Sequence, residues 1–222
     1  MRIGLFGGTF NPIHFGHLRV AEEVKEMFYL EKIYFIPSAI PPHKDTTEVA
    51  NAKDRLFMVE AAISKNPDFE LSHAEIDRKG TSYTIDTINH FKSIFPNSQL
   101  FFIIGLDAFL EVKTWKSCKN LFEKLPFIVL SRPKNYNKNC GDEKIIKNLE
   151  GYILKFISNE YSFNNKSMSF EHENKKTIFT CQVTPIIISS TKIRKMVREG
   201  KSIRYMVTDA IYEYIKSKKL YL

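Results

Sequence analysis

Short apolar runs that alternate with amphipathic stretches are the main pattern along this chain. Runs such as 100–105 and 126–131 are apolar throughout, which is typical of strands buried on both faces of a parallel sheet. Between such runs, apolar residues recur at helical spacing, as Leu18, Ala21 and Val24 do. The alternation predicts an α/β protein with an open parallel sheet, helices on both of its faces and a C-terminal helical segment. We expect strands at 3–6, 33–36, 69–76, 100–105, 126–131 and 178–183, and helices that begin near 15, 54, 84, 144, 190 and 208.

The start of the chain combines a strand, a glycine turn and a helix start. The apolar run at 3–6 leads into Gly7 and Gly8 and then into an Asn-Pro turn, and helical spacing begins at about Phe15. The N–H groups at a helix N-terminus suit a phosphate, and glycines let the backbone approach it closely. A Gly-Gly pair after a strand is also what an ordinary tight turn uses.

Two histidines lie three residues apart at this helix start. His14 and His17 share one face if both lie in the first turn, and imidazole N–H groups can donate to phosphate oxygens and stabilise charge during transfer. Two histidines at this spacing also occur in zinc sites, but the sequence shows no further ligand cluster, so we expect no metal held by protein ligands alone. The stretch fits neither the G-x-G-x-x-G fingerprint nor a P-loop.

Taken as a whole, the stretch GGTFNPIHFGHL resembles the H-x-G-H signature of the nucleotidyltransferase superfamily, whose fold is Rossmann-like. In particular it resembles the bacterial nicotinate-nucleotide adenylyltransferases. The resemblance implies that His14 and His17 contact ATP phosphates. The family commonly has Asp where this chain has Asn11. The nucleotide loop implied by the resemblance consists of Gly7, Gly8, Thr9 and Phe10.

Four further segments resemble the family and imply a mononucleotide site. From the residues alone they are a solvated lysine after a proline turn, a helix start capped by Ser82 or Thr84, a core tryptophan, and an arginine at a strand end. The resemblance implies that the P-P-H-K and S-R-P strings supply phosphate contacts, that the S-Y-T helix start receives the nicotinate carboxylate, and that the tryptophan stacks on the pyridine ring. The residues implied are Lys44, Tyr83, Thr84, Trp115 and Arg132.

Two segments add to the ATP site by resemblance. Asp107 follows the most apolar run. A carboxylate at this place could bind Mg²⁺ through a water molecule or could bind a ribose hydroxyl, and it could equally cap the next helix. The string ISSTKIR reads by itself as a capped helix with a surface arginine, Arg194. It resembles the second signature of the superfamily, which implies contacts to the β- and γ-phosphates. The residues implied there are Ser189, Ser190, Thr191 and Arg194.

Length and composition predict one globular domain. The chain has 222 residues, of which 43% are hydrophobic and 26% charged, enough for a full core. No apolar run approaches the roughly 18 residues of a membrane span, and the chain begins with a strand rather than a signal peptide, so we expect no membrane partner. Three widely spaced cysteines (Cys118, Cys140 and Cys181) favour reduced thiols in a cytoplasm.

The net charge of +8 invites a nucleic-acid interpretation, but the basic residues are spread along the chain and form no aromatic-interleaved motif. We therefore expect small anionic substrates and no nucleic acid. Residues 135–176 are rich in Asn, Lys and Glu and match no motif. We expect them to be a surface insertion in a single nucleotidyltransferase domain that spans 1–222.

The motifs occur in the order of the family, and the resemblance implies an enzyme of NAD biosynthesis. It would transfer the adenylyl group of ATP, with Mg²⁺, to nicotinate mononucleotide, giving nicotinate adenine dinucleotide and pyrophosphate. An anionic phosphate acceptor needs no enzyme base, so placement and charge cancellation are the expected contributions, with His14, His17 and Arg194 as the catalytic residues. Alternatives are a preference for nicotinamide mononucleotide or another phosphate acceptor, and a nucleotide sensor without turnover. A homo-oligomer stays open.

Overall fold

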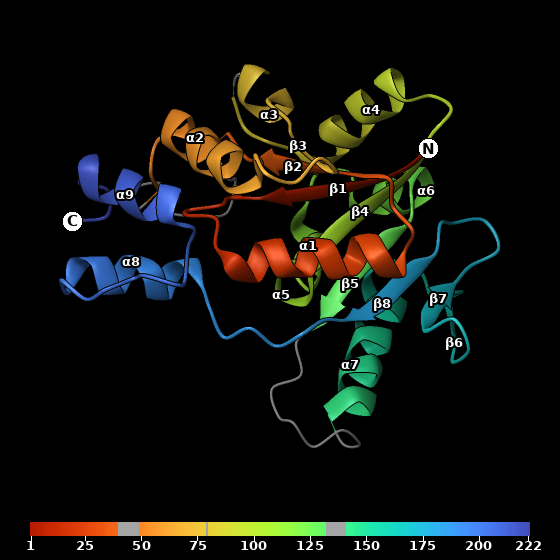
Figure 1. Cartoon of the computed structure of the whole chain (residues 1–222). Coiled ribbons are helices and arrows are strands. Elements are labelled where there is room, and N and C mark those ends of the chain that lie inside the picture. Colours follow the sequence, from red (N-terminus) through yellow and green to blue (C-terminus); the bar gives the residue numbers. More distant parts are fainter. Residues whose placement is uncertain (40–48, 79, 132–140) are drawn as a thin grey trace. The chain divides into compact units, whose positions relative to one another are not determined.

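The chain forms two compact units in a computed structural model that describes residues 1–39, 49–78, 80–131 and 141–222 (Figure 1). Unit 1 comprises Met1–Leu5 and Tyr83–Pro185, and unit 2 comprises Phe6–Ser82 and Ile186–Leu222. Strand β1 (Arg2–Gly8) belongs to both, because its first residues lie in unit 1 and its last residues in unit 2. The prediction of a single domain over 1–222 stays a prediction.

Unit 1 is built on the strands with the most continuous apolar sequence. Every residue of β5 (Phe127–Ser131) is buried, as are the inner residues of β4 (Gln99–Gly105). The two strands pair in parallel, with Phe102 opposite Phe127. Burial on both faces explains why these runs carry no alternation of apolar and polar residues. The other elements of unit 1 are α4 (Thr84–Ile94), α5 (Leu106–Phe109), the 3-10 helix η2 (Val112–Thr114), α6 (Cys118–Lys124), α7 (Gly141–Phe156), β6 (Ser162–Asn164), β7 (Ser169–Glu171) and β8 (Ile178–Gln182).

The polar tract at 158–176 contains a β-hairpin that the sequence pattern did not predict. Strand β6 pairs antiparallel with β7, and β7 pairs antiparallel with β8. Phe163 and Phe170 lie opposite each other in the hairpin with ring centroids 4.8 Å apart, and Phe170 is fully buried. Strands of three residues are too short to give an alternating signal. The wider expectation of a surface insertion at 135–176 stays a prediction.

Unit 2 begins with a strand–helix–strand element and carries the last two helices of the chain. Four of the six residues of β2 (Lys32–Pro37) are buried, and β2 pairs in parallel with β3 (Phe69–Leu71). Helix α1 (Phe15–Met27) buries Val20, Ala21 and Val24, which recur at the spacing of one helix face. The remaining elements are α2 (Ala52–Ile63), α3 (Ala74–Asp77), α8 (Ser190–Arg198) and α9 (Asp209–Ser217).

The described strands form one sheet of eight in the order β3-β2-β1-β4-β5-β8-β7-β6. The pairs β2–β3, β4–β5 and β5–β8 are parallel, whereas β6 and β7 add an antiparallel edge. The predicted α/β class with an open, mainly parallel sheet is therefore confirmed. The strand expected at 69–76 is wrong beyond Leu71, because the Ser72 hydroxyl accepts the backbone N–H of Ala74 and helix α3 starts there.

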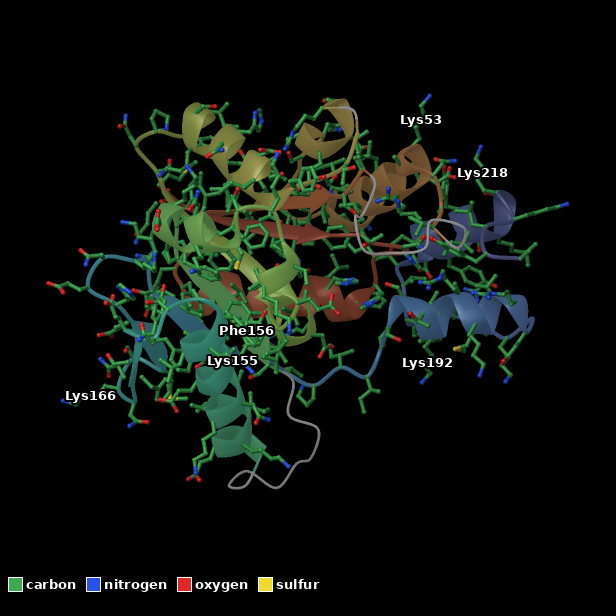
Figure 2. All side chains as sticks on the ribbon, turned by 180° about the vertical axis from the view of Figure 1, so that it is seen from behind. Lys53, Lys155, Phe156, Lys166, Lys192 and Lys218 are labelled. Atoms are coloured by element: carbon green, nitrogen blue, oxygen red, sulfur yellow. The ribbon has the colours of Figure 1, made fainter. Side chains whose placement is uncertain are left out.

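Lysine side chains carry much of the positive charge, and four of those labelled in Figure 2 point outward. Lys53, Lys192 and Lys218 of unit 2 and Lys166 of unit 1 extend away from the ribbon (Figure 2). Such side chains fit the dispersed charge expected from the sequence.

None of the helices in the described ranges is long and apolar enough to cross a membrane. Cys118 and Cys181 carry free thiols, whereas Cys140 lies outside the described residues. The cytoplasmic location expected from the cysteines stays a prediction.

Candidate nucleotide site

His14 and His17 lie together at the start of helix α1, as the spacing predicted. His14 directly precedes the helix and His17 is its third residue. Their rings stack, with centroids 3.8 Å apart and planes 25° from parallel. His17 Nδ1 accepts the backbone N–H of His14 at 3.3 Å, so the proton of a neutral His17 ring is on Nε2. His14 is buried and His17 half-buried, which makes Nε2–H of His17 the better placed donor for a ligand.

The glycine between the two histidines allows this arrangement. A Cβ atom on Gly16 would lie 3.0 Å from His14 Nδ1 and 3.1 Å from His14 Cε1. Contacts that short would require the His14 ring to shift by a few tenths of an ångström. A glycine at position 16 therefore lets the His14 ring pack closely against the helix backbone, a role that the sequence did not reveal.

Strand β1 ends two residues later than predicted, at Gly8. Gly7 and Gly8 are the last residues of the strand, so the expected glycine turn is wrong, and the left-handed backbone conformation falls on Phe10, with φ of 47°. A Cβ on Gly8 would lie 2.9 Å from the Phe10 ring, so this glycine permits close packing of the ring. Phe10 is buried and meets the His17 ring edge-on, with centroids 5.2 Å apart. Thr9 is half-buried.

Part of the backbone at the start of α1 is already bonded within the protein. The N–H of Phe15 donates to Met206 O at 3.1 Å, and the N–H of His17 donates to His14 O at 2.9 Å. The helix N-terminus is thus less open than the sequence suggested, and the histidine side chains become the main candidates for phosphate contact.

Helix α8 brings the second signature to residues 11–12, which follow the predicted nucleotide loop. Ser189 precedes the helix, and its hydroxyl accepts the N–H of Lys192 at 3.2 Å. Ser190 Oγ donates to Pro12 O at 2.9 Å, and Arg194 Nη1 donates to Asn11 O at 3.0 Å. Segments about 180 positions apart in sequence therefore meet at residues 11–12, directly before His14. Thr191, the second residue of α8, is exposed.

Two residues that hold this loop were not identified as functional from the sequence. Arg55 of α2 is 1% exposed and donates to the carbonyls of Thr9 at 2.9 Å, Ala39 at 3.0 Å and Ala50 at 3.0 Å. Asn11 Oδ1 accepts the N–H of Ala50 at 3.0 Å, so the amide that replaces the usual Asp is bonded to the backbone. Burial lowers the pKa of Arg55, although a guanidinium stays charged at neutral pH.

In unit 1, two of the residues expected near the nicotinate group, Tyr83 and Thr84, lie at the start of α4. Tyr83 directly precedes the helix and Thr84 is its first residue, so neither Ser82 nor Thr84 is the cap. Lys116 lies 4.6 Å from the centre of the Tyr83 ring and 3.3 Å from Asp86 Oδ2. Lys116 directly follows Trp115 in the sequence. The hydroxyl of Ser82 instead accepts the N–H of Ala39 at 2.8 Å, within unit 2.

Trp115 is half-exposed rather than part of the core. Its ring meets Phe102 edge-on, with centroids 6.5 Å apart. Its partial exposure is what a ring that stacks on a ligand needs.

Of the three remaining predicted site residues, the structure describes only Asp107. Asp107 is exposed in the first turn of α5 and is not the residue that caps it, which is Gly105. Lys44 and Arg132 lie outside the described residues. In the part of the chain that is described, no three His, Cys, Asp or Glu side chains gather closely enough to hold a metal ion.

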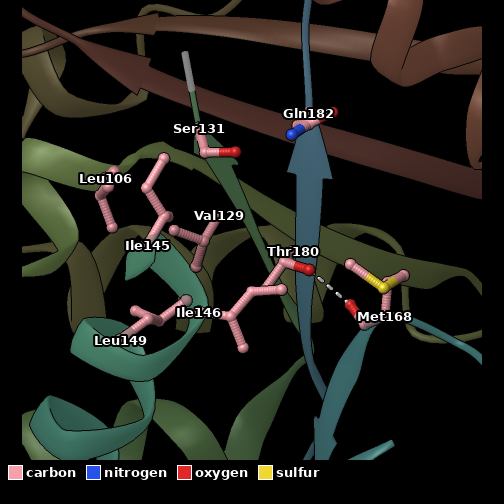
Figure 3. A pocket seen from close by; sticks show the side chains of 9 residues that line it. All are labelled: Leu106, Val129, Ser131, Ile145, Ile146, Leu149, Met168, Thr180 and Gln182. Carbon is pink, nitrogen blue, oxygen red and sulfur yellow. Dashed lines mark hydrogen bonds between the residues drawn. The ribbon is translucent and has the colours of Figure 1, made fainter. Parts of the chain in front are cut away.

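Unit 1 also contains a pocket of about 220 Å³ between helix α7 and strands β5 and β8 (Figure 3). Its walls include Ile146 and Leu149 of α7 and Val129 of β5, with Ser131 at one end. None of the described side chains that line it is charged, so we do not assign it to a phosphate.

The chain was compared with known proteins. The Cytidylyltransferase-like family matches residues 5–196. A "Probable nicotinate-nucleotide adenylyltransferase" of Desulfatibacillum aliphaticivorans is 44% identical over the full length of both chains. A protein of the same name from Citrifermentans bemidjiense is 37% identical over all of this chain and 99% of its own. The chain belongs to the nicotinate-nucleotide adenylyltransferase family.

The fold agrees with this family. The nicotinic acid mononucleotide adenylyltransferase of Plasmodium falciparum, solved in complex with NaAD, matches with a TM-score of 0.69 at 19% identity, covering 99% of this chain and 97% of that one. The same protein complexed with APC matches with a TM-score of 0.67 at 19% identity, covering 99% of this chain and 96% of that one. At this identity the match supports the Rossmann-like fold, and the resemblance read from the motifs is confirmed by the relatives.

Proposed function

We propose that this chain transfers the adenylyl group of ATP to nicotinate mononucleotide, which yields nicotinate adenine dinucleotide and pyrophosphate. The junction of the two signature segments supports this most directly. Ser190 and Arg194 bond to the carbonyls of Pro12 and Asn11, so donors from α8 and the His14–His17 pair are gathered in unit 2. A set of imidazole, hydroxyl and guanidinium groups is what a triphosphate requires.

In the proposed reaction the 5′-phosphate of the mononucleotide attacks the α-phosphorus of ATP in line. A bond forms from a phosphate oxygen to that phosphorus, the bond to the bridging oxygen breaks, and pyrophosphate leaves with the electron pair. The attacking oxygen is already anionic, so no side chain has to remove a proton. His17 donates from Nε2–H to the charge that develops on the phosphates, His14 fixes the ring of His17 by stacking, and Arg194 binds the leaving phosphates.

We propose Mg²⁺ as the metal that accompanies ATP. The donor set fits this role, because Mg²⁺ in nucleotide sites is commonly held by one or two carboxylates together with substrate phosphates. Asp107 offers one exposed carboxylate, and the described residues contain no three-ligand cluster that would hold a metal without the nucleotide. When bound, Mg²⁺ would neutralise phosphate charge.

The acceptor site that we propose lies at the residues around the start of α4. The N–H groups of its first turn suit the nicotinate carboxylate near Tyr83 and Thr84, and Trp115 supplies a face for the pyridine ring. Lys44 and Arg132 are proposed phosphate contacts by resemblance. Nucleic acid and membrane are not among the proposed partners, and a homo-oligomer remains a prediction.

Replacing Trp115 with Ala is expected to raise KM for nicotinate mononucleotide about 10- to 100-fold, because a ring–aromatic stacking contact is worth about 1–3 kcal/mol. KM for ATP should change little. The measurement is steady-state kinetics with each substrate varied in turn. Trp115→Phe is the matched control, since it keeps an aromatic face and should lose much less affinity. A Trp115→Ala variant with unchanged KM for the mononucleotide would remove Trp115 from the acceptor site, and an unaltered chain that makes no dinucleotide would contradict the proposed function.

A further inference from the structure

Arg55 is the largest fully buried side chain of the described residues. The amphipathic pattern of its helix does not explain why a charged residue is buried there. Helix α2 buries Met58, Val59 and Ile63 together with Arg55, so the arginine lies on the apolar face of the helix. A buried guanidinium is costly unless its N–H groups are bonded. Nε, Nη1 and Nη2 each donate to a backbone carbonyl at 2.9–3.0 Å, which offsets that cost.

The three carbonyls belong to three separate backbone segments of unit 2. Thr9 lies in the nucleotide loop, Ala39 follows strand β2, and Ala50 precedes helix α2. A planar fork of N–H groups can hold three diverging carbonyls at fixed angles, whereas the ammonium of a lysine donates from a single atom. Arg55 thus sets the spacing of these segments.

A continuous path of hydrogen bonds leads from Arg55 to the phosphate-binding arginine. Arg55 holds the carbonyl of Ala50, the N–H of Ala50 donates to Asn11 Oδ1, and Asn11 O accepts from Arg194. A second, shorter path runs through Thr9, which is two residues from Asn11. Burial raises the pKa of Tyr221, and the charges of Arg194 and Arg55 partly oppose the rise, so all three groups share one electrostatic environment.

We propose that Arg55 is a positioning residue of the ATP site. Its three hydrogen bonds fix the path of residues 9–12, and that path sets where Arg194 and the His14–His17 pair meet the phosphates. The inference rests on the proposed function, because it assumes that the ligand of this loop is a nucleoside triphosphate.

The test replaces Arg55 with Lys, which keeps the charge and loses the fork, and measures both turnover and binding of a non-hydrolysable methylene analogue of ATP. We expect Kd for the analogue to rise about tenfold and kcat to fall by at least as much, while KM for nicotinate mononucleotide changes less. The control is Met58→Ala in the same helix face. It should lower the melting temperature at least as far and leave both ATP parameters near those of the unaltered chain.

Asn11→Ser provides a second variant if Arg55→Lys does not fold, because it interrupts the path at Ala50 without exposing a buried charge. It should shift Kd for the analogue in the same direction. Analogue binding equal to that of the unaltered chain in the folded variants would overturn the role of Arg55, as would an equal loss in Met58→Ala. Failure of the proposed function appears differently: the unaltered chain would bind the analogue and form no dinucleotide. An unaltered chain that does not bind the analogue would refute both.

Discussion

Replacing His17 with Asn is expected to lower kcat about 100- to 1,000-fold, the usual cost of losing one donor to developing charge. The Asn side chain keeps an oxygen near the position of Nδ1, so it can still accept the N–H of His14, the 3.3 Å contact of His17. What it loses is the Nε2–H donor. KM for nicotinate mononucleotide should change far less than kcat, because His17 is assigned to the ATP phosphates.

His17→Ala removes the acceptor as well as the donor and should lower kcat at least as far. His90, an exposed histidine of α4, gives a matched control, and His90→Ala should leave both constants unchanged. Steady-state kinetics with each substrate varied separates the possibilities. Equal losses in kcat and in affinity for the mononucleotide would make His17 a binding residue instead.

Replacing Arg194 with Lys is expected to lower kcat/KM for ATP about 100-fold. A guanidinium can bond Asn11 O, at 3.0 Å from Nη1, and a phosphate oxygen at the same time, whereas one ammonium group is a poor substitute for that fork. The single substitution should therefore weaken both the link between α8 and Asn11 and the proposed contact to the leaving pyrophosphate.

Arg198 lies one turn further along α8 and is exposed, so Arg198→Lys is the control for general changes in helix charge. Pyrophosphate formation at varied ATP concentration gives the comparison. If the two variants lost the same activity, Arg194 would act only through the overall positive charge of α8.

The elements with a strong repeating pattern could be predicted from the sequence. Strands β4 and β5 are apolar throughout because both faces are covered, and the apolar spacing of α1 marks one buried face. The edge hairpin β6–β7 and the short helix α3 were missed, because three or four residues do not establish a period and the Ser72 hydroxyl decides the start of α3.

In the candidate site, some residues could be identified from motif resemblance and others only from the structure. Motif resemblance identified His14, His17 and the α8 start, which the structure brings together around residues 11–12. Arg55 was missed because its partners are backbone carbonyls of three distant segments, and a carbonyl carries no sequence signal. Gly16 lies within the motif, yet only the structure shows that a Cβ there would lie 3.0 Å from the His14 ring.

In the proposed acceptor site, the choice between acid and amide acceptors depends on backbone N–H groups near Thr84 and has no diagnostic side chain. The most direct test of the central claim is therefore pyrophosphate release with ATP and Mg²⁺, with nicotinate mononucleotide and nicotinamide mononucleotide compared side by side. The account predicts a kcat/KM at least about 100-fold higher for the acid, because the helix start of α4 would bond a carboxylate that the amide lacks. Equal use of the two acceptors, preference for the amide, or no release with either would contradict it.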